Sequence, residues 1–76
     1  MSVMTRSRFS VPDMVCDRCK VAIETAVRTQ PGIRSALVDL RGKVVTVEHD
    51  VRTPPAAVAE TIAAQGYEVG GYGEAA

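Results

Sequence analysis

The chain has 76 residues, a length that allows one small domain over residues 1–76 and no second core. Nine basic residues balance nine acidic ones, so the net charge does not favour a general polyanion or membrane-surface binder. Aromatic residues make up 4% of the chain and tryptophan is absent, which leaves no platform for stacking bases, so we expect no nucleic-acid binding.

A strand and a helix are expected first. Residues 5–11 alternate polar and apolar side chains and place Phe9 and Val11 on one face, which is typical of a half-buried strand. Apolar residues then recur at helical spacing from residue 16 or 17 until a Pro-Gly pair ends the pattern, which predicts a helix of about three turns. The apolar positions of this helix are Cys19, Ala22, Ile23, Ala26 and Val27, and Lys20, Glu24 and Arg28 are left for solvent.

Two strands and a second helix are expected next. Residues 33–40 and 44–49 are predicted to be antiparallel strands joined by a short turn that contains Gly42. Thr53 precedes two prolines and is expected to cap a second helix, which ends near residues 65–66. The apolar positions of these elements are Ala36, Val38, Leu40, Val45, Val47, Val58, Ile62 and Ala63.

Residues 67–72 form the last predicted strand, and the four residues after them are expected to fray. The order strand, helix, strand, strand, helix, strand contains two crossover units that place both helices on one face of a four-stranded antiparallel sheet. This is the α+β ferredoxin-like βαββαβ sandwich. Its first strand is central, so the loop that follows, with Cys16 and Cys19, is expected at an exposed tip of the domain.

The two cysteines, Cys16 and Cys19, are separated by Asp17 and Arg18. Side chains three positions apart at a helix start can place two sulfurs on opposite sides of one metal ion. The helix dipole, Arg18 and Lys20 all favour the thiolate, which is the form that binds metal. Two soft ligands without an evident third favour Cu(I) over Zn(II), which prefers four ligands.

An ordered set of residues is typical of a known family. The motif Met-x-Cys-x-x-Cys is present as Met14-Val15-Cys16-Asp17-Arg18-Cys19. With the residues below, which extend over nearly the whole chain, it resembles the heavy-metal-associated domains of copper chaperones and copper-transporting P-type ATPases. Arg18 differs from the small or polar residue usual there, and Pro12-Asp13 stands where a glycine commonly precedes the methionine. The other matching positions are Ile23-Glu24, Pro31-Gly32-Ile33, Val38 with Leu40, Val45 with Val47, Asp50 and Gly66-Tyr67.

The resemblance implies a copper carrier. It would bind one Cu(I) between Cys16 and Cys19 and pass the ion by ligand exchange to the CxxC motif of a partner, either a copper-transporting P-type ATPase or another such domain. A copper-bridged homodimer is a further arrangement, because one ion can recruit thiolates from two chains. We do not expect an enzyme, since no Ser-His-Asp set, phosphate loop or pair of catalytic carboxylates can be assembled with any specificity.

Other residues near the motif have two interpretations each. Met14 is expected to fill the core beneath the loop, the alternative being a thioether ligand. Tyr67 is either a second-shell group near the metal, as the resemblance suggests, or an aromatic at the edge of the core. Arg18 and Lys20 either stabilise thiolates and guide partner docking or are solvated charges. His49, in contrast, is not assigned to this region: it is expected on the surface, away from the cysteines.

Two other functions remain open. A Zn(II) or other divalent-metal module would use Asp13 or Asp17 as an oxygen ligand. A dithiol oxidoreductase would attack a substrate disulfide with Cys16 and resolve it with Cys19, although the chain lacks the aromatic residue before the motif and the later proline of the thioredoxin-like pattern.

The location in the cell is expected to be cytoplasmic. The first eleven residues contain no apolar run of seven or more, and no stretch approaches the roughly 20 apolar residues of a membrane span. Two cysteines are too few for the disulfide framework of a small secreted domain, and thiols outside such a framework fit a reducing compartment.

Overall fold

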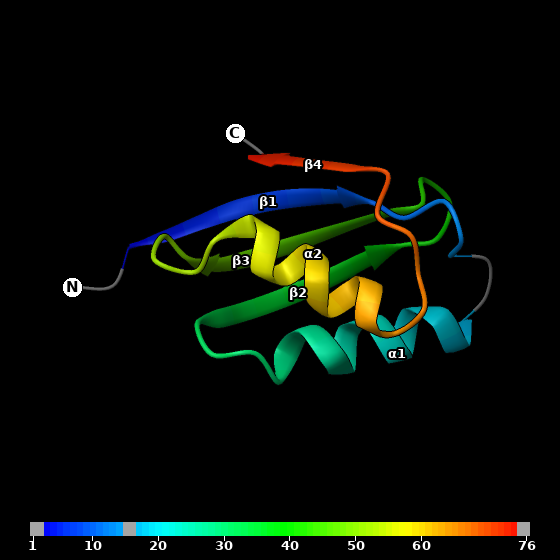
Figure 1. The fold of residues 1–76 in the computed structure, drawn as a ribbon, viewed down its shortest axis with the longest axis horizontal. Helices are drawn as coiled ribbons and strands as arrows, with labels where there is room; N and C mark the ends of the chain where they lie inside the picture. The colour runs from blue at the N-terminus through cyan, green and yellow to red at the C-terminus, as the bar shows by residue number, and fades with distance from the viewer. Residues whose placement is uncertain (1–2, 15–16, 75–76) are drawn as a thin grey trace.

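The structure, a computed structural model, describes residues 3–14 and 17–74. Its elements follow the predicted order, and both helices cover the same face of one four-stranded sheet (Figure 1). The strand order is β2-β3-β1-β4, and every neighbouring pair is antiparallel. The predicted α+β ferredoxin-like fold is therefore confirmed. The elements are β1 (Met4–Ser10), α1 (Asp17–Arg28), β2 (Ile33–Asp39), β3 (Val44–Asp50), α2 (Pro55–Ala64) and β4 (Gly71–Glu74).

The core lies between the helices and the inner face of the sheet. Successive strand residues point to opposite faces, so alternate positions are buried along β1 and β3. Phe9 on β1 pairs with Val45 on β3, which in turn pairs with Val38 on β2. This row carries the predicted apolar face across three strands. The buried apolar residues are Phe9, Val11, Met14, Cys19, Ile23, Val27, Ala36, Val38, Val45, Val47, Val58 and Ile62; Leu40 is only partly buried and Ala63 is exposed.

The last strand differs from its prediction. β4 begins at Gly71, whereas Tyr67 and Val69 pack against the core from the connection after α2. The ladder with β1 follows a hydrogen bond from the Gly70 amide to the Ser10 carbonyl, 2.8 Å long, and the pairing continues to Glu74. Backbone pairing with β1, rather than the positions of the apolar residues Tyr67 and Val69, therefore decides where this strand begins. The predicted fraying is therefore wrong for residues 73 and 74, and residues 75 and 76 lie outside the described ones.

The start of α2 also differs. The residue that precedes the helix is Pro54, without a side-chain cap, so the prediction that Thr53 caps the helix is wrong. The Thr53 hydroxyl donates instead to the Pro31 carbonyl at 3.4 Å. Gly32 makes this approach possible, because it has a φ of +87° and a Cβ there would collide with the Thr53 hydroxyl. The connection between α1 and β2 is thereby joined to the connection between β3 and α2.

Candidate metal centre

Three connections meet at one end of the domain. They are residues 11–14, which follow β1, residues 40–43 between β2 and β3, and residues 65–70 between α2 and β4 (Figure 1). The Val11 amide donates to the Lys43 carbonyl at 2.9 Å, so the first connection is joined to the second. Sheet topology thus brings the described residues before the two-cysteine motif to the same end of the domain as two segments distant in sequence.

Cys19 is the cysteine that the structure describes. It lies in the first turn of α1, belongs to the core cluster and is 9% exposed. Thiolates near a helix N-terminus are stabilised by the positive end of the helix dipole. Cys16 and Val15 lie outside the described residues. The pairing of Cys16 with Cys19 around a metal ion therefore remains a prediction.

Met14, the first residue of the motif, is fixed through both its side chain and its backbone. The side chain is fully buried in the core cluster, which confirms that it fills the core beneath the loop. Its amide donates to the Val11 carbonyl at 3.1 Å, which closes a turn over Pro12 and Asp13. Its carbonyl accepts a hydrogen bond from the Lys43 ammonium at 2.7 Å. The chain therefore leaves Met14 toward Cys16 from a fixed position.

Asp13 connects the same loop to the third connection. One of its carboxylate oxygens accepts a hydrogen bond from the Glu68 amide at 3.1 Å. Tyr67, which precedes Glu68, is partly buried against the core at this end of the domain. Asp17 lies exposed in the first turn of α1. Of the two oxygen ligands considered for zinc, Asp13 is thus engaged in holding the loop.

The outer side of α1 presents a shallow apolar hollow beside the motif. Its volume is about 380 Å³, and it is lined by Asp17, Arg18, Val21 and Ala22. Val21 is 59% exposed, and the neighbouring Arg18 is also exposed, whereas Lys20 is half-buried. Arg18 is therefore more accessible than Lys20, and the roles of both residues at the motif stay a prediction.

His49 is fully buried, so the prediction of a surface position is wrong. Its Nδ1 is 3.0 Å from the Asp50 carbonyl and its Nε2 is 2.8 Å from the Ser7 hydroxyl. A carbonyl oxygen only accepts, so Nδ1 carries a proton, and in the neutral ring the Ser7 hydroxyl therefore donates to Nε2. The ring lies at the end of β3 that pairs with Thr5, opposite the cysteine-containing loop. The predicted separation is confirmed for Cys19, the cysteine that the structure describes.

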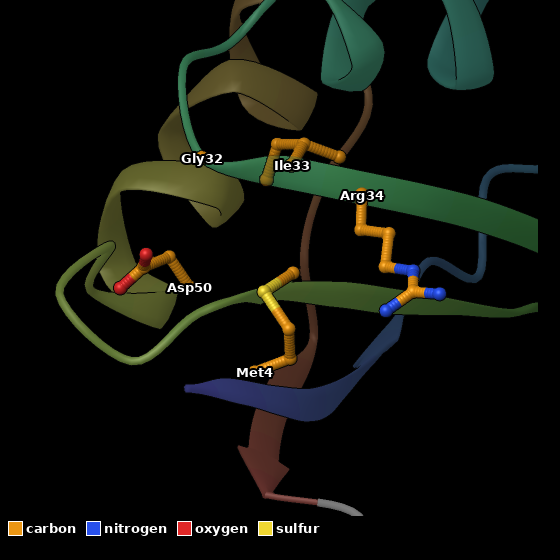
Figure 2. A pocket seen from close by; sticks show the side chains of 5 residues that line it. All are labelled: Met4, Gly32, Ile33, Arg34 and Asp50. Atoms are coloured by element: carbon orange, nitrogen blue, oxygen red, sulfur yellow. The ribbon is translucent and has the colours of Figure 1, made fainter. Parts of the chain in front are cut away.

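A second hollow lies at the end of the sheet where His49 is found. It has a volume of about 410 Å³ and is lined by Met4, Gly32, Ile33, Arg34 and Asp50. Figure 2 shows the side chains of Met4 and Arg34 reaching toward β3 from the strands on either side of it. The pKa of Asp50 is lowered from its ordinary 3.8, chiefly because its carboxylate accepts a hydrogen bond from the Arg52 amide and then from the Arg52 side chain.

This second hollow offers no alternative metal centre. Over residues 3–14 and 17–74 there is no group of three or more His, Cys, Asp or Glu side chains placed to hold a metal ion. Nor does this part of the chain contain a helix long and apolar enough to span a membrane.

Lys43 is the residue of this end that sequence reasoning missed. It lies 29 positions from Met14, so no local pattern relates the two. The one available signal was its place in a turn beside Gly42, at the end of the sheet where the first connection was expected.

Comparison with known proteins identifies the family. The heavy-metal-associated domain family matches residues 8–68, so the chain belongs to this family. A copper chaperone CopZ of Staphylococcus haemolyticus is 37% identical over 67 residues, which cover 87% of this chain and 98% of that protein. A solved CopZ metallochaperone is 32% identical with a TM-score of 0.83, over 86% of this chain and 98% of that one. A copper binding domain from a P-type ATPase, 23% identical with a TM-score of 0.82 over 95% of both chains, shares the fold.

Proposed function

We propose that this protein is a copper metallochaperone that binds one Cu(I) ion through the thiolates of Cys16 and Cys19. The observation that carries the proposal is a two-cysteine motif, with Cys16 before α1 and Cys19 in its first turn, in a chain that is 37% identical to a copper chaperone over 98% of that chaperone's length. The ion is cargo rather than a catalytic group, so the protein acts as a carrier and not as an enzyme. The cytoplasm, where thiols stay reduced, is the compartment that suits it.

The donor set suits a soft ion of low coordination number. Two thiolates satisfy Cu(I), whereas Zn(II) would require two further ligands. Cys19 is held in the first turn of α1, where the helix dipole favours its thiolate. The complex of one Cu(I) with two thiolates carries one net negative charge, which the neighbouring Arg18 and Lys20 can offset. Met14 supports the loop from the core instead of ligating the ion.

Transfer proceeds by ligand exchange. A thiolate of the partner forms a bond to copper, giving a three-coordinate complex, and one bond from copper to Cys16 or Cys19 then breaks. A second exchange moves the ion completely. Copper remains Cu(I) throughout, and the protons lost by the incoming thiols can be taken up by the thiolates that are released. No oxidant or reductant is needed.

The partner is a domain with its own CxxC motif, such as the metal-binding domain of a copper-transporting P-type ATPase. The shared fold of such a domain supports this, because two similar surfaces can present their motifs to one another. Docking would occur through Arg18 and Val21, which lie beside the motif on α1, and through Tyr67, which lies at the same end of the domain. A copper-bridged pair of identical chains is the corresponding homodimer.

A transfer assay tests this function. The copper-loaded chain is mixed with an apo CxxC domain of a P-type ATPase, and copper in each protein is measured after separation. We expect copper to reach the same distribution whichever protein is loaded first. A Cys16→Ser/Cys19→Ser variant should neither carry nor accept the ion. Copper that stays entirely with the loaded protein, from both directions, would contradict transfer by exchange.

A further inference from the structure

Lys43 connects the β2–β3 turn to the loop that leads to the cysteines. Its ammonium donates to the Met14 carbonyl at 2.7 Å, and its own carbonyl accepts from the Val11 amide at 2.9 Å. A hydrogen bond from a charged donor is stronger than a neutral one, and here it lies in a partly buried setting where water competes less. Lys43 therefore holds the loop at both ends of the turn that precedes the motif.

The turn that carries Lys43 is itself held in place. One oxygen of the Asp39 carboxylate accepts from the amides of Arg41 and Gly42, at 3.0 and 3.1 Å. This side-chain cap is a common way to fix a tight turn. The ammonium of Lys43 thus extends from a fixed turn rather than from a mobile one, so its contact with Met14 restrains the loop.

The backbone of Lys43 indicates that the side chain has a specific use. Its φ is +55°, the one positive φ among the described non-glycine residues. This left-handed conformation is unfavourable for lysine, whereas glycine or asparagine would adopt it more readily. When a residue other than glycine or asparagine occupies a position with positive φ, an interaction of its side chain is the best explanation for its presence. The side-chain contact in the structure is the Met14 carbonyl.

We propose that Lys43 is a positioning residue for the metal-binding loop: it fixes the Met14 carbonyl and so orders the chain that enters Cys16. This inference rests on the proposed function for the site that it serves. With the Met14 side chain buried and its carbonyl held, less of the free energy of metal binding is spent on ordering the loop. The contact also places a positive charge at Met14, which precedes Cys16 by two positions in the sequence.

The test compares four variants. Lys43→Met removes the ammonium at the same backbone cost, Lys43→Arg retains a charged donor, and Lys43→Asn removes the ammonium while favouring the positive φ. The matched control is Arg41→Met, which removes one positive charge from the same turn. The Arg41 side chain is exposed and makes no hydrogen bond or ion pair within the described part of the chain.

The first measurement is amide hydrogen exchange of the reduced, metal-free protein. We expect exchange at the Met14 amide to rise about fivefold or more in Lys43→Met and Lys43→Asn, with Val47 unchanged. Lys43→Arg and Arg41→Met should behave like the wild type. This measurement does not involve metal, so it decides whether Lys43 holds the loop even if copper binding by the wild type fails.

The second measurement is Cu(I) affinity by chelator competition. We expect an about tenfold loss for Lys43→Met and Lys43→Asn, recovery to within about threefold for Lys43→Arg, and no change for Arg41→Met. Lys43→Asn should unfold no more easily than the wild type, so its loss of affinity cannot be assigned to unfolding. Unchanged exchange or unchanged affinity in both neutral variants would overturn the inference, and an equal loss in Arg41→Met would assign the effect to overall charge instead.

Discussion

Ser7 on β1 and His49 on β3 form a fully buried hydrogen bond, 2.8 Å long, at the end of the sheet opposite the cysteine-containing loop. Removing one partner leaves a buried polar atom unsatisfied, whereas replacing both by apolar groups removes the penalty. We therefore expect Ser7→Ala to lower the free energy of unfolding by about 1–3 kcal/mol. Adding His49→Phe to it should recover much of that loss.

Urea unfolding of the two single variants and the double variant measures this coupling. Cu(I) affinity should remain that of the wild type in Ser7→Ala, since the pair lies far from the motif. Strictly additive losses in the double variant would show that the hydrogen bond contributes no coupling.

Met14 offers a test of core filling against metal ligation. Met14→Leu conserves volume and should cost less than about 1.5 kcal/mol, whereas Met14→Ala leaves a cavity and should cost about 2–5 kcal/mol. Because the thioether is buried in the core, Met14→Leu should keep Cu(I) affinity within about threefold of the wild type. A far larger loss in a variant that remains folded would make the sulfur a ligand.

Substitution of Gly32 and of Gly66 by alanine tests two effects on stability. One is the strain of a positive φ, and the other is the collision of an added Cβ with a neighbouring side chain. Both glycines have positive φ, +87° and +93°, but a Cβ on Gly32 would collide with the Thr53 hydroxyl whereas Gly66 has open space around it. We expect Gly66→Ala to lower the free energy of unfolding by about 1–2 kcal/mol and Gly32→Ala to lower it further. Thermal or urea unfolding compares them, and equal losses would argue against the close packing of Thr53.

The Asp50 carboxylate is expected to contribute to the dependence of the free energy of unfolding on pH. Its pKa in the folded state lies below 3.8 because the carboxylate accepts hydrogen bonds from the Arg52 amide and side chain. Such a group stabilises the fold above its unfolded pKa, and that contribution is lost as pH falls through the folded value. Between about pH 5 and pH 2 the wild type should therefore lose more free energy of unfolding than Asp50→Asn. Parallel curves for the two proteins in urea titrations would contradict this assignment.

Local patterns were sufficient for most of the fold. Period-two alternation placed Phe9 and Val11 inside, and helical spacing placed Cys19, Ile23 and Val27 on the buried face of α1. These predictions succeed because each buried face repeats within one element. The motif from Met14 to Cys19 was likewise recognisable from adjacent residues alone.

Contacts between distant residues account for what the sequence did not predict. His49 was expected at the surface because its partner, Ser7, is 42 positions away. β4 was placed too early, since its position follows from pairing with β1 while its own glycines carry no apolar pattern. Lys43 was passed over because its contact with Met14 exists only once the sheet has formed. Cys16 lies outside the described residues, so its place in the site is still the prediction of the motif.

The central claim is selective Cu(I) binding by Cys16 and Cys19. Its most direct test titrates the reduced protein with Cu(I) and, separately, with Zn(II), each against a competing chelator, with Cys16→Ser/Cys19→Ser as the control. We predict one Cu(I) per chain, bound far more tightly than Zn(II), and loss of that binding in the double variant. Effective competition by zinc, or equal copper binding by wild type and variant, would contradict the claim and favour the divalent-metal or the dithiol function instead.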